Sequence, residues 1–329
     1  MIMRSALRAP CRLPSQAVAL VAVAVGLAAL TAGCAGAGPG AGRSRPRPDA
    51  AGSHRAGDPA ASTGGPAADG AAAAPGRVSV RHFVLPDGAA MAVALFTGGV
   101  RFVLHCGTLD PGPLCRGKVS AGQRVTRMER GQLIAAFNGG FKLSAGAGGY
   151  EQEGTVISPL RRGLASLVIY SSGAASIGIW GDGVPQPGQQ VYSVRQNLVP
   201  LVRNGRPTPA SALNWGNWGG TITGVDNTAR SAIGENARGQ LIYVASMSAT
   251  PSDLADALVR AGAVIGMELD INQEWVQFDY SRRPGGSLVK AAVDQWRPAN
   301  QYLTGWTRDF IAVLAGWPLV PAAGARPVP

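Results

Sequence analysis

Residues 265–272, with the sequence IGMELDIN, alternate apolar and polar side chains and so predict a β-strand. The apolar residues fall on one face of this strand, and Glu268, Asp270 and Asn272 fall on the other. Side chains two residues apart on a strand are about 7 Å apart, a spacing that lets two acids hold one polar substrate. Because Asp and Glu are poor strand formers, this face is either a functional site or an exposed strand face with solvated acids.

The rest of the chain after residue 76 predicts short strands, turns and few helices. Apolar segments at 90–96 and 100–104 flank Thr-Gly-Gly and predict a hairpin, and further pairs are expected at 164–170 with 175–180 and at 230–234 with 240–246. Single strands are expected at 132–137 and at 198–202, the second ending at an Asn-Gly turn. One helix is clear, because Thr250 can cap it, Pro251 fits its first turn and Gly262 follows its apolar stripe.

These elements predict an α+β fold with a mixed β-sheet and few helices in a single globular domain. The helix lies between the segments 240–246 and 263–272, so we expect a right-handed crossover between two parallel strands.

The first 33 residues predict a signal peptide of the lipoprotein type. Residues 1–16 contain arginines and no acid, and an apolar run at 17–32 leads into the sequence LTAGC, which ends at Cys34. The alternatives are ordinary secretory cleavage and an uncleaved anchor, for which the run is near the lower limit of ~17–25 residues. We therefore expect an exported protein on the outer face of the cell membrane, with lipid on Cys34, and a secreted protein as the alternative.

Residues 34–76 contain no aromatic residue and no aliphatic residue larger than Ala. Such a segment cannot bury enough apolar surface to offset the entropy lost on ordering, which predicts a disordered tether. Residues 77–329 then form the globular domain, and one domain can accommodate this length.

Cys106 and Cys115 bracket a loop that contains Pro-Gly-Pro. An oxidising compartment would allow them to form a disulfide. The alternative, a catalytic thiol, needs a base, and His105 would point away from Cys106 on a strand. The domain is poor in histidine and has no zinc-binding, serine-hydrolase or phosphate-loop motif, so acid–base chemistry would fall to carboxylates.

The net charge of the chain is +11, which suits glycans that carry phosphate or uronate groups. We find no nucleic-acid-binding motif, and export argues against such a partner. The expected partners are therefore a cell-envelope glycan or sugar-phosphate polymer and, through the lipid anchor, the membrane.

Several motifs in this order resemble the phosphodiester glycosidase family, whose bacterial members are often labelled exopolysaccharide-related. They are AAFNGGF at 135–141, LVPLVRNG at 198–205 and ARSAIG at 229–234, followed by the capped helix and the Asp-bearing strand. The resemblance covers about residues 130–315. The family's N-A-G-F-F, R-x-A-I-G and N-L-D-G-G-G-S-S elements match at Asn138, Gly140 and Phe141, at Arg230 and Ala232–Gly234, and at Leu269 and Asp270.

The resemblance implies a domain of the phosphodiester-glycosidase type and an exported hydrolase. Its substrate would be a sugar-1-phosphodiester or glycosidic bond in a cell-envelope or exopolysaccharide glycan. Taken together with the strand alternation, it makes Asp270 and Glu268 the expected catalytic residues. The expected substrate-binding residues are Asn138 and Arg230, which match the family's motifs, and Asn272, Glu274 and Trp215, which are chosen from their own position and chemistry.

The Gly-Ser loop that follows the family's Asp is absent here. Its absence favours the alternative of a non-catalytic, glycan-binding envelope lipoprotein that keeps the fold. Structural interpretations also stand beside the functional ones: an Asx-turn for Asn138, a surface ion pair for Arg230 and core packing for Trp215 and Trp218. No cofactor is expected, although a row of oxygen ligands could bind Ca²⁺, and a metal requirement stays open.

Overall fold

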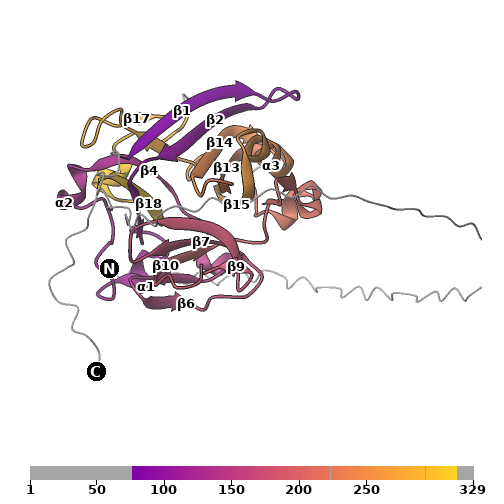
Figure 1. The fold of residues 1–329 in the computed structure, drawn as a ribbon. Coiled ribbons are helices and arrows are strands. Elements are labelled where there is room, and N and C mark those ends of the chain that lie inside the picture. The colour runs from indigo at the N-terminus through magenta and orange to yellow at the C-terminus, as the bar shows by residue number, and fades with distance from the viewer. Residues whose placement is uncertain (1–75, 223, 293, 317–329) are drawn as a thin grey trace, which may run out of the picture. The chain divides into compact units, whose positions relative to one another are not determined.

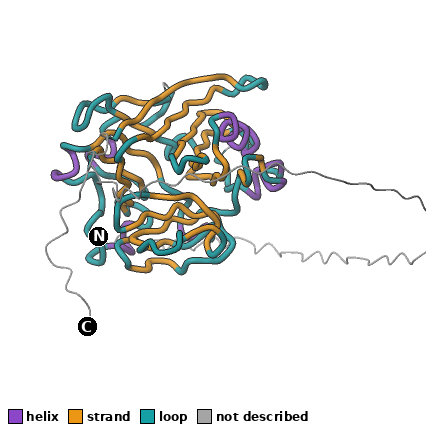
Figure 2. The backbone as a smooth tube through the Cα atoms, viewed as in Figure 1, coloured by secondary structure: helices purple, strands orange, loops and turns teal. Residues whose placement is uncertain are grey.

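The strands of the domain form three sheets, and the helices are few and short (Figures 1 and 2). This arrangement is seen in a computed structural model, which describes residues 76–222, 224–292 and 294–316. All of these residues belong to one unit of the chain, Ala68–Pro329. The predicted signal peptide, the lipidation site at Cys34 and the tether lie outside the described residues.

The largest sheet has seven strands, and each strand is antiparallel to its neighbours. In spatial order they are β1 (Arg77–Val84), β2 (Ala90–Thr97), β14 (Leu241–Ala249), β13 (Thr228–Asn236), β15 (Ala263–Ile271), β11 (Val202–Arg203) and β12 (Arg206–Pro207). The helix α3 (Pro251–Arg260) connects β14 to β15. These two strands are parallel, as the sequence predicts, but they are not hydrogen-bonded to each other because β13 lies between them.

Helix α3 begins where the sequence predicts. The Thr250 side chain accepts a hydrogen bond from the Asp253 backbone, and the Asp253 carboxylate accepts one from the Thr250 backbone. Leu254 and Leu258 are fully buried and pack with apolar residues of β2, β13 and β14. The helix therefore covers one face of the seven-stranded sheet.

The second sheet has six strands and the third has five. The second contains β6 (Thr155–Ser158), β5 (Tyr150–Gln152), β10 (Val191–Gln196), β7 (Ala165–Tyr170), β8 (Ala175–Trp180) and β9 (Gly183–Val184), and only β8 and β9 are parallel. The third contains β17 (Val289–Lys290), β16 (Phe278–Tyr280), β4 (Leu133–Asn138), β18 (Phe310–Ala315) and β3 (Val100–His105), all antiparallel to their neighbours. The short helices are α1 (Gly112–Cys115), α2 (Arg127–Arg130), α4 (Gln301–Thr304), η1 (Leu143–Ala145), η2 (Pro209–Ala212) and η3 (Trp215–Asn217).

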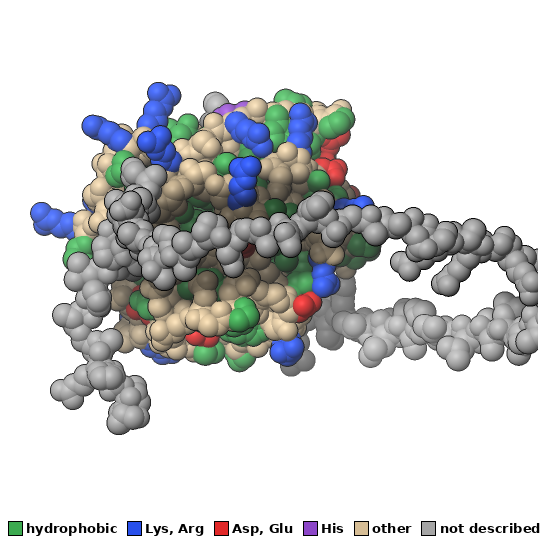
Figure 3. Space-filling model, in the orientation of Figure 1, with side chains coloured by type: hydrophobic (Ala, Val, Ile, Leu, Met, Phe, Trp, Pro, Cys, Tyr) green, Lys and Arg blue, Asp and Glu red, His purple; other side chains and the backbone are tan. Residues whose placement is uncertain are grey.

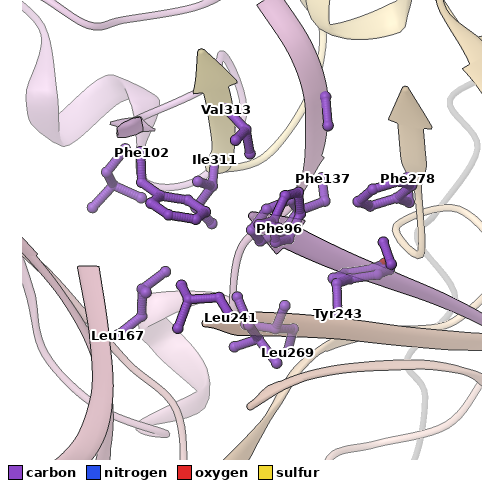
Figure 4. Packing of buried hydrophobic residues seen from close by; sticks show 14 of the residues in the cluster. Phe96, Phe102, Phe137, Leu167, Leu241, Tyr243, Leu269, Phe278, Ile311 and Val313 are labelled. Carbon is purple, nitrogen blue, oxygen red and sulfur yellow. The ribbon is translucent and has the colours of Figure 1, made fainter. Parts of the chain in front are cut away.

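The three sheets share one hydrophobic core. Figure 4 shows side chains from all three sheets meeting there: Phe96 and Leu269 from the seven-stranded sheet, Leu167 from the six-stranded sheet, and Phe102 and Phe137 from the five-stranded sheet. The aromatic rings pack in tilted, stacked and edge-to-face arrangements, with centroids 4.8–6.2 Å apart in the pairs around Phe96, Tyr243 and Phe278.

Much of the predicted strand pattern is confirmed, but its assembly into one mixed sheet is wrong. The segments at 90–96 and 100–104 are both strands, yet they do not form a hairpin, because β2 and β3 belong to different sheets. The chain changes sheets at Gly98, whose φ is +72°. Phe96 and Phe102 on either side of this turn pack against each other inside the core, 5.5 Å apart. The predicted strand at 198–202 is also largely absent, since only Val202 joins a strand.

Cys106 and Cys115 form a disulfide, as expected, between the end of β3 and α1. Among the helices that the structure describes, none has the length and the apolar character needed to cross a membrane.

Candidate active site

Asp270 lies near the end of β15, where the seven-stranded and five-stranded sheets meet. Its backbone amide donates a hydrogen bond to the carbonyl of Gly139, which directly follows β4 (2.8 Å). Gly139 in turn donates its amide proton to the carbonyl of Asp309, directly before β18 (2.8 Å). The ends of three strands that are distant in sequence therefore converge at Asp270.

Asp270 is 3% exposed, and its carboxylate is held by two donors. Its Oδ2 accepts a hydrogen bond from Nη1 of Arg308 (2.6 Å), and its Oδ1 accepts one from the backbone amide of Ile271 (2.9 Å). Burial raises the pKa of Asp270 to about 7, although the Arg308 guanidinium opposes this rise. A carboxyl that titrates near neutral pH can exchange protons with a substrate or with water.

The two glycines after Asn138 allow a second buried acid to approach. A Cβ on Gly139 would collide with the Asp309 carboxylate, and a Cβ on Gly140 would lie 2.8 Å from the guanidinium carbon of Arg195. Arg195 and Asp309 form a buried ion pair of 2.7 Å, and Arg195 also donates to the Phe141 carbonyl. The Asn-Gly-Gly-Phe motif is thus explained by close packing around this ion pair.

Asn138 has a mainly structural environment. Its amide nitrogen donates to the Ser231 hydroxyl (2.8 Å) and to the Gly139 carbonyl (3.2 Å). Its amide oxygen accepts from the Tyr243 hydroxyl (2.8 Å) and from the Gln277 backbone amide (3.2 Å). The side chain therefore joins strands of two sheets rather than forming the Asx-turn considered from sequence, and its part in substrate binding stays a prediction.

Glu268 and Arg230 form a fully buried ion pair, with Nη1 2.8 Å from Oε1. Arg230 also donates to the carbonyls of Ala249, Trp218 and Asp226. Burial raises the pKa of Glu268 to about 8 against the attraction of Arg230, and Oε2 of Glu268 is buried without a hydrogen-bond partner. The surface ion pair considered for Arg230 is wrong, because this pair is inside the protein.

A register shift separates the two acids of β15. Ala232 of β13 pairs with Glu268, and Arg230 pairs with Ile271, so three residues of β15 span the same distance as two of β13. Such a bulge re-aims the side chains of the bulged strand. Asp270 pairs with Arg308, whereas Glu268 pairs with Arg230.

Asn272 lies just beyond β15 with a φ of +73°. Its amide oxygen accepts from the Ile222 backbone (3.1 Å), and its amide nitrogen donates to the Gly220 carbonyl (3.2 Å). The prediction that Asn272 continues the strand face is therefore wrong, because its amide holds a neighbouring loop. Trp218 of the same region is buried in the core, whereas the side chain of Trp215 lies outside the described part of the chain.

A small cavity lies beside Asp270. Its volume is about 10 Å³, which is roughly the space that one water molecule needs. The cavity is lined by Asn138, Asp270, Glu274, Thr307, Arg308 and Asp309, among other residues. Oε2 of Glu274 and Oγ1 of Thr307 are buried without hydrogen-bond partners. Of the predicted site residues, Asn138, Asp270 and Glu274 therefore meet at one cavity, and neither Arg230 nor Glu268 lines it.

Two tryptophans and two arginines border the same cavity. The guanidinium of Arg308 lies 3.8 Å from the centroid of the Trp275 ring, and that of Arg297 lies 4.5 Å from the Trp306 ring and 5.6 Å from the Trp275 ring. These are cation–π distances. Trp306 is 56% exposed, so this group of four side chains, called here the Trp–Arg cluster, reaches the surface.

No group of three or more His, Cys, Asp or Glu side chains in the described residues is placed to hold a metal ion. Glu268, Asp270 and Asn272 each have different partners and do not converge on one point. Figure 3 shows more Lys and Arg than Asp and Glu on the visible face, in keeping with the basic composition.

Sequence reasoning missed Arg308, Asp309, Trp306 and Arg195. A signal for part of this set was present, because the run Trp-Thr-Arg-Asp at 306–309 directly precedes the apolar strand β18. Charged residues at the start of a fully buried strand indicate a role at the strand end. The partners of these residues could not be identified without the sheet order.

Comparisons with known proteins give distant structural likenesses. No protein-family model and no curated protein matches the chain. The catalytic domain of zebrafish N-acetylglucosamine-1-phosphodiester alpha-N-acetylglucosaminidase, auto-inhibited by its pro-peptide, is similar over 75% of this chain and 85% of that chain, with 16% identity and a TM-score of 0.45. A hypothetical protein from Synechocystis is similar over 73% of this chain and 62% of that chain, with 15% identity and a TM-score of 0.43. TM-scores this low carry no conclusion about activity.

Proposed function

We propose that the protein is an exported hydrolase that cleaves a sugar-1-phosphodiester or glycosidic bond in a cell-envelope or exopolysaccharide glycan. The observation that supports this most directly is the buried Asp270 carboxylate, which has a pKa of about 7 and borders a cavity of about 10 Å³. This cavity has room for one water molecule, the nucleophile that hydrolysis requires.

In this mechanism Asp270 acts as the general base. It takes a proton from water, the hydroxide oxygen bonds to the anomeric carbon, and the bond from that carbon to the leaving oxygen breaks. A phosphate leaving group keeps the electron pair as a phosphate monoester and needs no proton, whereas the alkoxide that leaves from a glycosidic bond takes a proton from solvent. Arg308 holds the carboxylate in position through its 2.6 Å hydrogen bond.

The remaining predicted residues fall into two groups. Glu274 borders the cavity, and its unpartnered Oε2 can accept a hydrogen bond from a sugar hydroxyl. Asn138 and the Arg230–Glu268 pair hold β15, which carries Asp270, against its neighbouring strands. Direct contact of Arg230 or Glu268 with substrate would require a conformation different from this one, because both side chains are fully buried.

The Asp270→Asn variant tests the proposal. General-base catalysis contributes about 10²–10⁴-fold to a rate, so hydrolysis of a sugar-1-phosphodiester or an envelope glycan should fall by at least about a hundredfold. The melting temperature should stay within a few degrees, because the amide keeps an acceptor for Arg308 and removes a buried charge. Asp182→Asn is the matched control, since Asp182 is exposed in a surface ion pair. A fully active Asp270→Asn protein would refute the assignment.

The alternative is a non-catalytic, glycan-binding envelope lipoprotein. Its support is the size of the cavity, because a sugar ring does not fit into about 10 Å³. A glycan would then bind to the exposed Trp–Arg cluster outside the cavity. Wild-type protein that binds glycan and never hydrolyses it would favour this function over the enzyme.

A further inference from the structure

The Trp–Arg cluster contains hydrogen-bond donors that the described residues leave unused. The Arg308 side chain donates only from Nη1, to Asp270, and the Arg297 side chain donates only from Nε, to the Glu274 carbonyl. A guanidinium has five N–H donors in a planar fork, so several on each arginine have no partner among the described residues.

Both guanidinium groups lie beside the Trp275 ring, at 3.8 Å and 5.6 Å from its centroid, so their central carbons are at most about 9.4 Å apart. Both arginines also line the Asp270 cavity. The Arg308 side chain is 12% exposed and therefore has limited freedom to move away. An oxyanion between two guanidinium groups at such a separation can accept hydrogen bonds from the unused donors of both.

The backbone around Trp306 also has an unusual conformation. Trp306 has a φ of +66° and follows Gly305, whose φ is +96°. A positive φ is unfavourable for a bulky residue and is found where the surroundings impose it, often at functional sites. Here the Trp306 amide donates to Oγ1 of Thr108 (3.1 Å), which holds the ring next to Arg297.

The polar atoms of the adjoining cavity point to a ligand as well. Oε2 of Glu274 and Oγ1 of Thr307 are buried without partners beside Asp270 and both arginines. Leaving a buried polar group unpaired is unfavourable. The Thr307 hydroxyl can donate to an oxyanion, whereas the Glu274 oxygen can only accept and would take a hydrogen bond from a sugar hydroxyl of the same ligand.

We propose that Arg297 and Arg308 together bind one oxyanion, a phosphate or carboxylate group of a glycan, at the mouth of the Asp270 cavity. The proposal rests on the proposed function only for the placement of this group beside the bond that is cleaved. It specifies the substrate as a glycan that carries its negative charge next to that bond.

Isothermal titration of the full chain with inorganic phosphate, methyl phosphate and glucuronate tests the proposal directly. We expect saturable binding of the phosphates, of glucuronate or of both, and this result identifies the charged group. Arg297→Gln and Arg308→Gln should each weaken binding at least tenfold. Arg203→Gln, at an exposed ion pair with Asp182, is the matched control and should bind as the wild type does.

Arg297→Gln and one further variant, Arg308→Lys, keep the test informative if Arg308→Gln folds poorly. Arg297→Gln removes no partner from a carboxylate, because the hydrogen bond of Arg297 ends on a carbonyl. Arg308→Lys keeps a positive charge near Asp270 but loses the planar fork, so it should also weaken anion binding. Binding of equal strength in all variants, or no saturable binding of any of these anions, would overturn the proposal.

These experiments distinguish failure of the oxyanion site from failure of the proposed function. Binding that depends on both arginines, in a protein that hydrolyses nothing, keeps the oxyanion site and removes the enzyme. Hydrolysis of a neutral glycoside at the same rate in the wild type and in Arg297→Gln, without anion binding, keeps the enzyme and removes the oxyanion site.

Discussion

Arg230→Ala is expected to destabilise the domain strongly rather than to weaken substrate binding alone. The Arg230 and Glu268 side chains are both 0% exposed and are 2.8 Å apart. The substitution removes four hydrogen bonds and leaves three backbone carbonyls and one carboxyl without this donor. Removing one partner of a buried ion pair costs about 3–5 kcal/mol.

The loss of stability within this range depends on the pH of the measurement. With its pKa raised to about 8, Glu268 is largely protonated at pH 7 and carries little uncompensated charge in the variant, so we expect about 3 kcal/mol there. Above pH 8 the wild type releases this proton, whereas the variant, without Arg230, retains it. The loss of stability should therefore grow by about 1.4 kcal/mol per pH unit above pH 8.

Urea denaturation of both proteins at pH 6, 7, 8 and 9 measures this difference. Arg203→Ala is the control, because Arg203 pairs with Asp182 at the surface and such pairs contribute about 0–1 kcal/mol. A variant within 1 kcal/mol of the wild type at every pH would refute the reasoning. A loss that is large but independent of pH would show that the hydrogen bonds to the carbonyls, and not the ion pair, carry the effect.

Three more predictions follow from the same features. Stability should fall as the pH rises from 5 to 8 in urea denaturation, because folding raises the pKa values of Glu268 and Asp270 and such carboxyls stabilise the protein while protonated; a rise would contradict these shifts. Gly139→Ala should cost at least about 1–3 kcal/mol, because its Cβ would collide with a buried carboxylate, and an unchanged melting temperature would count against this packing. Cys34→Ala should abolish labelling with radioactive palmitate and release the protein from the membrane, and unchanged labelling would exclude lipidation at Cys34.

Local features of the fold could be predicted because neighbouring residues encode them. The Thr250–Asp253 capping box and Pro251 specify where α3 begins, and the structure confirms it. The turn at Asn204 and Gly205 likewise connects β11 to β12. Each of these features depends on contacts within a few residues.

The division of strands among three sheets could not be predicted, because it depends on packing between distant segments. Two segments of alternating residues joined by a turn sequence look the same whether the strands pair or enter different sheets. After Gly98, β2 and β3 enter different sheets. The site shares this dependence, since Asp270 meets Arg308 only because β4 and β15 end where β18 begins.

The two acids of β15 show how one alternating pattern can serve two functions. Alternation places Glu268 and Asp270 on one face of the strand. Each acid nevertheless pairs with a different arginine, Glu268 with Arg230 and Asp270 with Arg308. Glu268 is enclosed with Arg230 and stabilises the sheet, whereas Asp270 borders the cavity beside Arg308. Two acids at this spacing therefore indicate that a site is near, but only the contacts made by distant segments decide which acid borders the cavity.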